Sequence, residues 1–467
     1  MARPAESVHA VIKAYDVRGV VGEQIDVDFV RDVGGAFARL VRDVENPADR
    51  VVIGHDMRDS SPELANAFAD GVTAQGLDVV LIGLASTDQL YFASGLLDCP
   101  GAMFTASHNP AKYNGIKLCR SGAKPVGQDT GLATIAAEVI EGVPGFGDTT
   151  RGSARGGGEA GSVSEQDVLA EYADFVRGLV DLSSMKPMAV AVDAGNGMGG
   201  YTVPAVFAPL PLTVDPMYFE LDGNFPNHEA NPLDPKNLVD LQERVRTTGA
   251  DIGLAFDGDA DRCFVVDELG NPVSPSAVTA LVAERELAKE PGATIIHNLI
   301  TSRAVPELVT ELGGTPVRTR VGHSFIKQQM AETGAIFGGE HSAHYYFRDF
   351  WGADSGMLAA LHVLAALGEQ DRPLSDLMKS YERYEASGEI NSTVADAAER
   401  TAAVLAAFSG RTKSVDRLDG VTVNLGQGAW FNLRASNTEP LLRLNVEART
   451  VEEVDALVAE ILGVVRA

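Results

Sequence analysis

The stretch Val51-Val-Ile-Gly-His-Asp-Met-Arg-Asp-Ser-Ser-Pro62 decides the fold, because it begins a pattern that recurs along the chain. An apolar strand leads into a polar turn, an amphipathic helix over residues 63–75 follows, and a second apolar strand covers 79–83. Further copies begin at Met188-Ala-Val-Ala-Val192 and at Ala293-Thr-Ile-Ile296. These strand–helix–strand units predict three related α/β domains with mixed or mostly parallel sheets.

The last part of the chain, from about residue 386, has a different pattern. The stretches 419–426 and 429–434 indicate a hairpin, 442–446 adds a strand, and 451–465 has apolar residues at helical spacing. We expect a smaller α+β domain there. Between the first two repeats, the Gly-, Ser- and Thr-rich stretch 145–164 predicts a loop or linker.

Composition narrows the classes of function. The 467 residues are 45% hydrophobic and 22% charged, which is ordinary for a soluble globular protein. The net charge of −27 and the lack of a basic run argue against nucleic acid or an anionic membrane as partner. Cys99, Cys119 and Cys263 form no C-x-x-C pair, so we expect neither a disulfide framework nor a structural zinc site, and a cytoplasmic location. No apolar stretch suits a signal peptide or a membrane span.

The motif Asp257-Gly-Asp-Ala-Asp-Arg262 follows an apolar run, Ile252-Gly-Leu-Ala-Phe256, that suits a strand. Small residues between Asp257, Asp259 and Asp261 let the three carboxylates point at one centre, which suits a hard divalent cation such as Mg²⁺. An EF-hand calcium loop fits less well, because Arg262 replaces the glycine that its turn needs. An acidic surface turn is the other alternative.

A second motif, Thr105-Ala-Ser-His-Asn-Pro110, follows the apolar stretch Gly101-Ala-Met-Phe104. Asn109-Pro110 indicates a sharp turn, so Ser107 is expected on a loop at the end of a buried strand, where α/β folds build their sites. Lys112 and Lys117 could offset charge on a phosphorylated serine or move a proton. The alternative is a turn serine that caps its own backbone.

Two loops in the second half of the chain are also dense in polar groups. Gly339-Glu-His-Ser-Ala-His344 suits sugar hydroxyls, since a glutamate accepts from paired hydroxyls, and zinc is the alternative. Arg434-Ala-Ser-Asn-Thr-Glu-Pro440 suits a phosphate, and a helix cap formed by Ser436 and Glu439 is the alternative.

Two smaller polar stretches complete the set. Lys13-Ala-Tyr-Asp-Val-Arg-Gly19 adds two cations and a phenol, and Val321-Gly-His-Ser-Phe-Ile-Lys327 adds an imidazole and a lysine. Because the polar clusters lie on predicted loops of every predicted domain, we expect them to meet in one cleft.

In this order along the chain, the motifs at 13–19, 105–110, 257–262, 339–344 and 434–440 resemble the α-D-phosphohexomutases, and within them the bacterial phosphomannomutase/phosphoglucomutase group. The resemblance implies α/β domains at 1–160, 161–268 and 269–382 and an α+β domain at 383–467 around a central cleft. These domains would carry, in turn, the phosphoserine, metal, sugar and phosphate loops. Ala260 and Ala343 stand where the family commonly has glycine.

The resemblance also implies roles for individual residues. Ser107 would carry a phosphoryl group and, with the three aspartates, hold one Mg²⁺ ion per chain. Proton transfer would fall to Lys117 and His344. The remaining candidates at the reacting end and for substrate binding are Tyr15, Arg18, His108, Arg262, His323, Glu340, Ser342, Arg434, Ser436, Asn437 and Thr438.

The activity implied is interconversion of mannose 6-phosphate and mannose 1-phosphate, and also of glucose phosphates. Hexose 1,6-bisphosphate would be intermediate and activator, and the protein would be a monomer or homodimer. A phosphoglucosamine mutase, a metal-dependent sugar phosphatase and a non-catalytic sugar-phosphate-binding protein are the alternatives. The sequence of the loop at 339–344 favours the mannose and glucose enzymes over the glucosamine enzyme.

Overall fold

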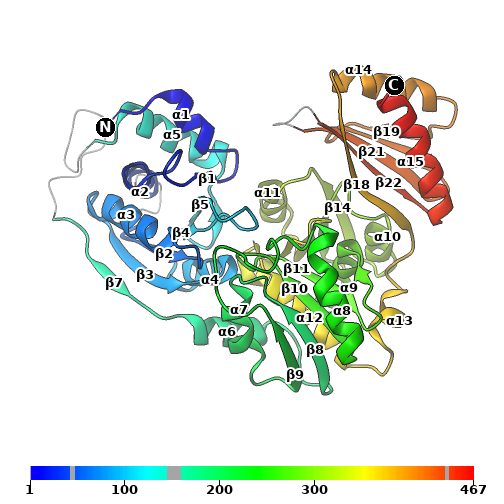
Figure 1. The fold of residues 1–467 in the computed structure, drawn as a ribbon, viewed down its shortest axis with the longest axis horizontal. Helices are drawn as coiled ribbons and strands as arrows, with labels where there is room; N and C mark the ends of the chain where they lie inside the picture. The colour runs from blue at the N-terminus through cyan, green and yellow to red at the C-terminus, as the bar shows by residue number, and fades with distance from the viewer. Residues whose placement is uncertain (1, 43–47, 145–158, 437–440) are drawn as a thin grey trace. The chain divides into compact units, whose positions relative to one another are not determined.

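The computed structural model describes residues 2–42, 48–144, 159–436 and 441–467, except the side chains of residues 323 and 324. The chain divides into two compact units, which are described separately (Figure 1). The first unit contains Met1–Pro272 and His344–Leu374, and the second contains Val273–Ala343 and Ser375–Ala467.

A seven-stranded mixed sheet forms the N-terminal part of the first unit, in the order β1-β5-β4-β2-β3-β7 with β6 beside β5. Strands β4, β2, β3 and β7 are mutually parallel, whereas β5 is antiparallel to β4, β1 and β6. The strands are β1 (Val17–Val20), β2 (Arg50–His55), β3 (Asp78–Leu84), β4 (Gly101–Phe104), β5 (Tyr113–Arg120), β6 (Lys124–Pro125) and β7 (Val163–Glu165).

Helices cover this sheet and form one apolar core with it (Figure 1). Phe37 of α2 packs against Phe68 of α3, and Phe68 packs against Phe104 at the end of β4, with ring centroids 5.8 and 5.6 Å apart. Burying these large rings provides much of the apolar contact that holds helices and sheet together. The helices of this core are α1 (Ala5–Val11), α2 (Val27–Arg42), α3 (Ser61–Thr73) and α5 (Leu132–Glu141). Helix α4 (Thr87–Leu97) packs against β2 and β4 outside this core.

A second mixed sheet in the same unit has the order β12-β11-β10-β8-β9. Strands β10, β8 and β9 are parallel and β11 is antiparallel to β10. Its elements are α6 (Leu169–Gly178), β8 (Met188–Asp193), α7 (Gly199–Phe207), β9 (Leu212–Met217), α8 (Val239–Thr248), β10 (Ile252–Phe256), β11 (Cys263–Asp267) and β12 (Pro272–Val273). The unit also contains the antiparallel pair β16 (Tyr345–Phe347) and β17 (Ala353–Asp354), and the buried helix α12 (Gly356–Gly368).

The second unit joins a parallel set of strands, β14-β13-β15, to an antiparallel sheet, β18-β22-β21-β20-β19. Helices α14 and α15 pack on the antiparallel sheet, where Phe408 meets Phe431 with ring centroids 5.0 Å apart. The elements are α9 (Pro275–Lys289), β13 (Thr294–Asn298), α10 (Ala304–Glu311), β14 (Thr315–Thr319), α11 (His323–Thr333), β15 (Phe337–Gly339), α13 (Leu374–Met378), β18 (Glu385–Thr393), α14 (Ala397–Phe408), β19 (Ser414–Asp416), β20 (Val421–Gly426), β21 (Ala429–Ala435), β22 (Leu441–Ala448) and α15 (Val451–Val465).

The predicted fold class, mixed α/β sheets followed by a smaller α+β domain, is confirmed. The strands at Gly101–Phe104 and Ile252–Phe256 and the helix at Val451–Val465 have the predicted bounds. The linker prediction was wrong at its end, because Val163–Glu165 pairs with β3 as a parallel edge strand. Helix α3 begins earlier than predicted, since Pro62 fits the first turn of a helix. The domain boundaries and the central cleft stay predictions.

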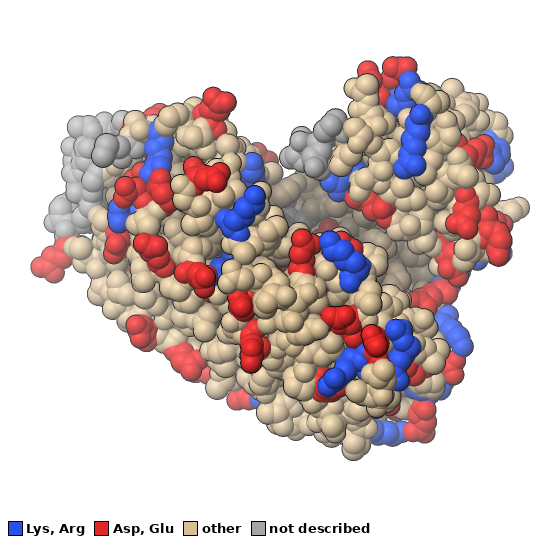
Figure 2. Space-filling view, in the orientation of Figure 1, with Lys and Arg blue, Asp and Glu red and all other residues tan. Residues whose placement is uncertain are grey.

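Acidic side chains are spread over the visible face of each unit, with lysines and arginines between them (Figure 2). This distribution agrees with the net charge of −27. Among the described residues, no helix has the length and apolar character that a membrane span needs.

Candidate active site

The loop between β4 and β5 presents Ser107 in an unusual backbone conformation. Its φ of +49° lies in the left-handed region, which residues other than glycine rarely adopt. The Ser107 amide donates a hydrogen bond to the Thr105 hydroxyl at 2.8 Å. The buried Ser107 hydroxyl in turn donates to the Asp257 carboxylate at 2.9 Å. The serine loop of the first sheet therefore meets the acidic loop of the second.

The acidic loop joins β10 to β11 and places its three aspartates together. Oxygen atoms of Asp257, Asp259 and Asp261 lie within 4.8 Å of one another, and all three side chains are buried. The backbone turns through Ala260, whose φ is +59°. Asp257 also accepts hydrogen bonds from the backbone amide of Arg262 at 3.1 Å and from its guanidinium at 3.0 Å.

Gly258 lets the two loops come close together. A Cβ atom at this position would lie 2.3 Å from the carbonyl oxygen of Ser107, which is too close for any side chain. The glycine between the first two aspartates therefore serves the contact with the serine loop as well as the turn itself.

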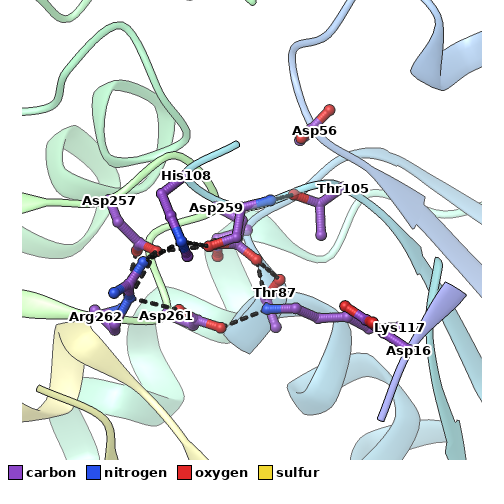
Figure 3. Close-up of polar contacts among 12 residues, drawn as sticks. Asp16, Asp56, Thr87, Thr105, His108, Lys117, Asp257, Asp259, Asp261 and Arg262 are labelled. Atoms are coloured by element: carbon purple, nitrogen blue, oxygen red, sulfur yellow. Dashed lines mark hydrogen bonds and ion pairs between the residues drawn. The ribbon is translucent and has the colours of Figure 1, made fainter. Parts of the chain in front are cut away.

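Lys117 and Thr87 bind the other two aspartates (Figure 3). The Lys117 ammonium group reaches Asp259 at 2.7 Å and Asp261 at 2.6 Å. The Thr87 hydroxyl donates to Asp259 at 2.6 Å, and the Thr87 amide donates to the Asp259 carbonyl at 3.0 Å. Lys117 comes from β5 and Thr87 from α4, so a strand of the first sheet and a helix packed on that sheet also hold the acidic loop.

Burial and charge shift the pKa values of this group in different directions. Burial raises the pKa of Asp257 to about 8, even though the cation of Arg262 opposes the rise. Burial also disfavours the charged form of Lys117, but Asp259 and Asp261 outweigh it and raise the pKa of Lys117 well above its ordinary value. Three buried acidic groups beside only two cationic side chains thus do not all ionise easily, and Asp257 is the one that holds its proton.

These residues fit a divalent metal ion. One oxygen each of Asp259 and Asp261 is buried and has no hydrogen-bond partner among the described residues. Buried oxygens of this kind are normally satisfied, and carboxylate oxygens are the ligands that Mg²⁺ takes. A bound cation would satisfy both atoms and favour the ionised form of Asp257.

Arg18, His108 and Arg262 lie beside the serine. Arg18, on β1, donates to the Asn109 side chain at 2.6 Å and pairs with Asp16 at 2.6 Å. The Arg262 guanidinium contacts the His108 ring nitrogen that lies 3.1 Å from the Ser107 hydroxyl. Burial, with the nearby cations of Arg262 and Arg18, lowers the pKa of His108 to about 3. His108 is therefore a neutral imidazole here.

His344 completes the candidate residues of the first unit that contact the acids. Its ring nitrogen lies 3.7 Å from an oxygen of Asp261, and Asp261, His344 and Asp354 form a second group with metal-ligand spacing. Tyr15 is exposed on the segment before β1.

The sugar-loop candidates lie in the second unit, directly after β15. The buried Glu340 accepts hydrogen bonds from the Asn298 side chain at 3.2 Å and from the Gly322 amide at 3.3 Å. Ser342 is half-buried on the same turn, and Ala343 has a φ of +64°.

The phosphate-loop candidates lie at the end of β21. Arg434 contacts Glu389 at 3.4 Å, and the Ser436 amide donates to the Leu441 carbonyl at 2.9 Å. Asn437, Thr438 and the side chain of His323 lie outside the described parts of the chain.

Some residues at these sites were missed by reasoning from sequence. Thr87 binds Asp259 although the chain gives no local signal for it. Arg443 is the register partner of Arg434 and shares Glu389 with it at 3.1 Å, which only strand pairing reveals. Arg58 lies in the stretch quoted first above, where a polar turn after a buried strand was the available signal.

Models of one protein family match four successive parts of the chain. Family models described as phosphoglucomutase/phosphomannomutase α/β/α domains I, II and III match residues 9–142, 170–270 and 274–384. The model of the C-terminal domain matches residues 389–464. All four domains of one family are thus present, in order.

Relatives and solved structures extend over the whole chain. A protein named phosphohexose mutases from Xanthomonas campestris pv. campestris is 41% identical over 440 residues, 94% of each chain. A phosphomannomutase from Escherichia coli K12 is 40% identical over 447 residues, again 94% of each. A crystal structure of a phosphoglucomutase/phosphomannomutase family protein from Burkholderia thailandensis has a TM-score of 0.86 at 31% identity and covers 100% of this chain and 98% of its own.

The fold, the site and these similarities define a phosphohexomutase, an enzyme of the isomerase class. The chain belongs to the phosphoglucomutase/phosphomannomutase family. The resemblance in the sequence motifs is thereby confirmed.

Proposed function

We propose that this enzyme interconverts mannose 6-phosphate and mannose 1-phosphate, and also the corresponding glucose phosphates, through a phosphorylated Ser107. The observation that carries the proposal is the 2.9 Å contact between the Ser107 hydroxyl and Asp257, beside two unsatisfied carboxylate oxygens. A phosphoryl group on Ser107 would adjoin the acidic cluster, and a cation between them would neutralise both. The names of the relatives support the sugar-phosphate substrate.

The reaction transfers one phosphoryl group in each direction. In the first step, the bond between phosphorus and the Ser107 oxygen breaks, and a bond from phosphorus to the free sugar hydroxyl forms. The hydroxyl proton passes to a protein base, the leaving Ser107 oxygen takes up a proton, and the product is a hexose 1,6-bisphosphate. The intermediate then turns over and returns its other phosphoryl group to Ser107, so that no phosphate is consumed.

The protein's part in this step is positioning and charge stabilisation. We assign Arg262, Arg18 and His108 to the reacting end, because they lie against the Ser107 loop. Lys117 and His344 are the groups we propose for proton transfer. Asp257, Asp259 and Asp261 would hold one Mg²⁺ ion, whose charge would stabilise the phosphoryl oxygens.

The second unit is assigned to substrate recognition. Glu340 and Ser342 would contact sugar hydroxyls, and Arg434 with Ser436, Asn437 and Thr438 would hold the phosphate that does not react. We include Tyr15 and His323 among the substrate-binding residues on the resemblance alone. Hexose 1,6-bisphosphate would also activate the enzyme by phosphorylating a free Ser107.

One incubation separates this function from its alternatives. The enzyme is mixed with mannose 1-phosphate, Mg²⁺ and a trace of glucose 1,6-bisphosphate, and both isomers and free phosphate are quantified. A mutase forms mannose 6-phosphate without net release of phosphate, whereas a phosphatase releases phosphate and a binding protein changes nothing. Parallel rates with glucose and glucosamine phosphates rank the sugars.

The Ser107→Ala variant tests the carrier directly. It should lose at least about 10⁴-fold in kcat because the nucleophile is gone, yet keep its fold, since alanine also fits a buried position. Intact mass should show a phosphoryl adduct on the wild-type enzyme and none on the variant. Near-normal turnover by the variant would contradict the assignment.

A further inference from the structure

Arg58 lies on the loop after β2, and its side chain contacts the loop that carries Ser107. The side chain is 1% exposed, and each N–H group of its guanidinium has an acceptor. One N–H binds Asp56 at 3.1 Å. The other four bind backbone carbonyls of the serine loop and of the first residue of β5: Ser107 at 2.9 Å, Asn109 at 2.7 Å, and Pro110 and Tyr113 at 3.0 Å each.

Asp56 orients Arg58 and also contacts the serine loop directly, through Thr105. Its carboxylate accepts from the Arg58 guanidinium, from the Arg58 amide at 3.0 Å and from the Ser61 hydroxyl at 2.6 Å. A hydrogen bond also joins Asp56 to the Thr105 hydroxyl. That hydroxyl accepts the Ser107 amide at 2.8 Å, so the chain of contacts runs from Asp56 to the backbone of Ser107.

A loop between β9 and α8 also packs against Arg58. The ring of Phe225 lies 5.1 Å from the centre of the guanidinium, which is within reach of a cation–π contact. Gly223 approaches the Arg58 backbone so closely that a Cβ atom there would lie 2.7 Å from the Arg58 Cα. This packing keeps water away from the guanidinium, and its hydrogen bonds to the carbonyls are stronger for that reason.

These contacts matter because Ser107 holds a disfavoured backbone conformation. Left-handed angles persist in a residue with a side chain only where surrounding structure enforces them. The conformation directs the Ser107 hydroxyl at Asp257. Arg58 donates hydrogen bonds to four backbone carbonyls here, so the support for this conformation comes from outside the local sequence.

We propose that Arg58 is a positioning residue for phosphoryl transfer: its guanidinium, oriented by Asp56 and covered by Phe225, fixes the loop that aims Ser107 at the metal and the sugar. The proposal rests on Ser107 as the phosphoryl carrier. It requires arginine specifically. A lysine ammonium has its three donors on one atom and cannot span four carbonyls, although it keeps the charge.

The test compares Arg58→Lys with wild type and with Arg39→Lys. Arg39 is also a buried arginine of the first domain, but it pairs with Glu138 at 2.9 Å and lies outside the site. We measure kcat and KM for mannose 1-phosphate, and the rate at which glucose 1,6-bisphosphate phosphorylates Ser107, by intact mass. Arg58→Lys should lower kcat and the phosphorylation rate by about 100-fold and change KM less than about threefold. Arg39→Lys should leave all three unchanged.

A second variant provides a test that still works if Arg58→Lys does not fold. Phe225→Leu keeps the loop apolar but removes the ring face, and should lower kcat by about tenfold without changing KM. The proposal is overturned if a folded Arg58→Lys enzyme turns over like wild type, or if both lysine variants lose kcat equally. Should Arg58→Lys not fold, an unchanged kcat in Phe225→Leu overturns it. If wild type itself takes up no phosphoryl group, the proposed function fails instead.

Discussion

The Ser107 hydroxyl lies 2.9 Å from the Asp257 carboxylate, although 150 residues separate them along the chain. The contact joins the first sheet to the second, and Lys117 repeats that junction by binding Asp259 and Asp261. Both sides of the contact are buried. The geometry proposed for catalysis and the packing of the two sheets therefore depend on the same few polar contacts.

The acidic cluster should bind Mg²⁺ measurably even without substrate. We expect EDTA to abolish turnover and Mg²⁺ to restore it. We also expect saturating Mg²⁺ to stabilise the folded protein by about 2–3 kcal/mol at 100 times its Kd, seen as a rise in Tm.

Asp259→Asn should lose that rise in Tm, because it removes a charged ligand. Asp70→Asn, at an exposed position on α3, is the matched control and should keep it. An unchanged Mg²⁺ response in Asp259→Asn would show that the ion binds elsewhere.

Asp88 should make stability depend on pH. Its buried carboxylate accepts hydrogen bonds from Tyr172 and Ser355 at 2.7 Å each and from Ser86. Burial raises the pKa of Asp88 from 3.8 to about 6, so the folded state holds its proton more tightly than the unfolded state does. Stability contributed by this proton is complete below about pH 4 and is lost as the pH rises through about 6.

The variant Asp88→Asn removes this titration. Its free energy of unfolding, relative to wild type, should therefore rise by about 2–3 kcal/mol between pH 4 and pH 7. Urea denaturation in EDTA at several pH values measures it, with the metal removed so that only the protein's own charges act. Parallel stability curves for the two proteins would refute the expectation.

Ala260 and Ala343 adopt left-handed backbone angles that are unfavourable for alanine. Both have positive φ, of +59° and +64°. Ala260→Gly should stabilise the protein by up to about 1 kcal/mol, because glycine adopts left-handed angles without strain. Ala402→Gly, in the exposed middle of α14, should instead destabilise by about 1 kcal/mol. Thermal unfolding measures the change in stability of each variant. Changes of the same sign in the two variants would contradict the backbone argument.

Arg443 should contribute to substrate binding beside Arg434. The two arginines face each other across β21 and β22 and share Glu389, next to the proposed phosphate loop. Arg443→Ala should raise KM by about 10- to 100-fold, the range for a lost charge-assisted hydrogen bond, and change kcat less than about threefold. Arg449→Ala, at an exposed position just after β22, is the control and should behave like wild type. A loss confined to kcat would assign Arg443 another role.

Reasoning from sequence succeeded where the signal was short-range. The bounds of β4 and β10 followed from continuous apolar runs that end at polar loops, and those of α15 from helical spacing. It missed β7, whose exposed residues gain their structure only by pairing with β3. Edge strands of this kind have no apolar pattern of their own, so composition indicated a linker.

The candidate site also contains residues that local sequence predicts and residues that only the fold brings together. The three aspartates are close in sequence, so their spacing alone predicted a cation site. Thr87, Arg58 and Arg443 reach their partners only through the fold, since the chain places them 172, 49 and 54 residues from Asp259, Ser107 and Glu389. Their side chains are ordinary polar groups in sequence and become specific only through those partners.

The order of residues by itself determined which elements form and which loops carry reactive groups, because apolar periodicity and turn chemistry act over a few neighbouring residues. Only the tertiary structure decided that Ser107 points at Asp257 and that Arg58 holds the serine loop. Left-handed backbone angles and buried charges are unfavourable on their own, so they exist only where distant parts of the chain supply the contacts that compensate for them.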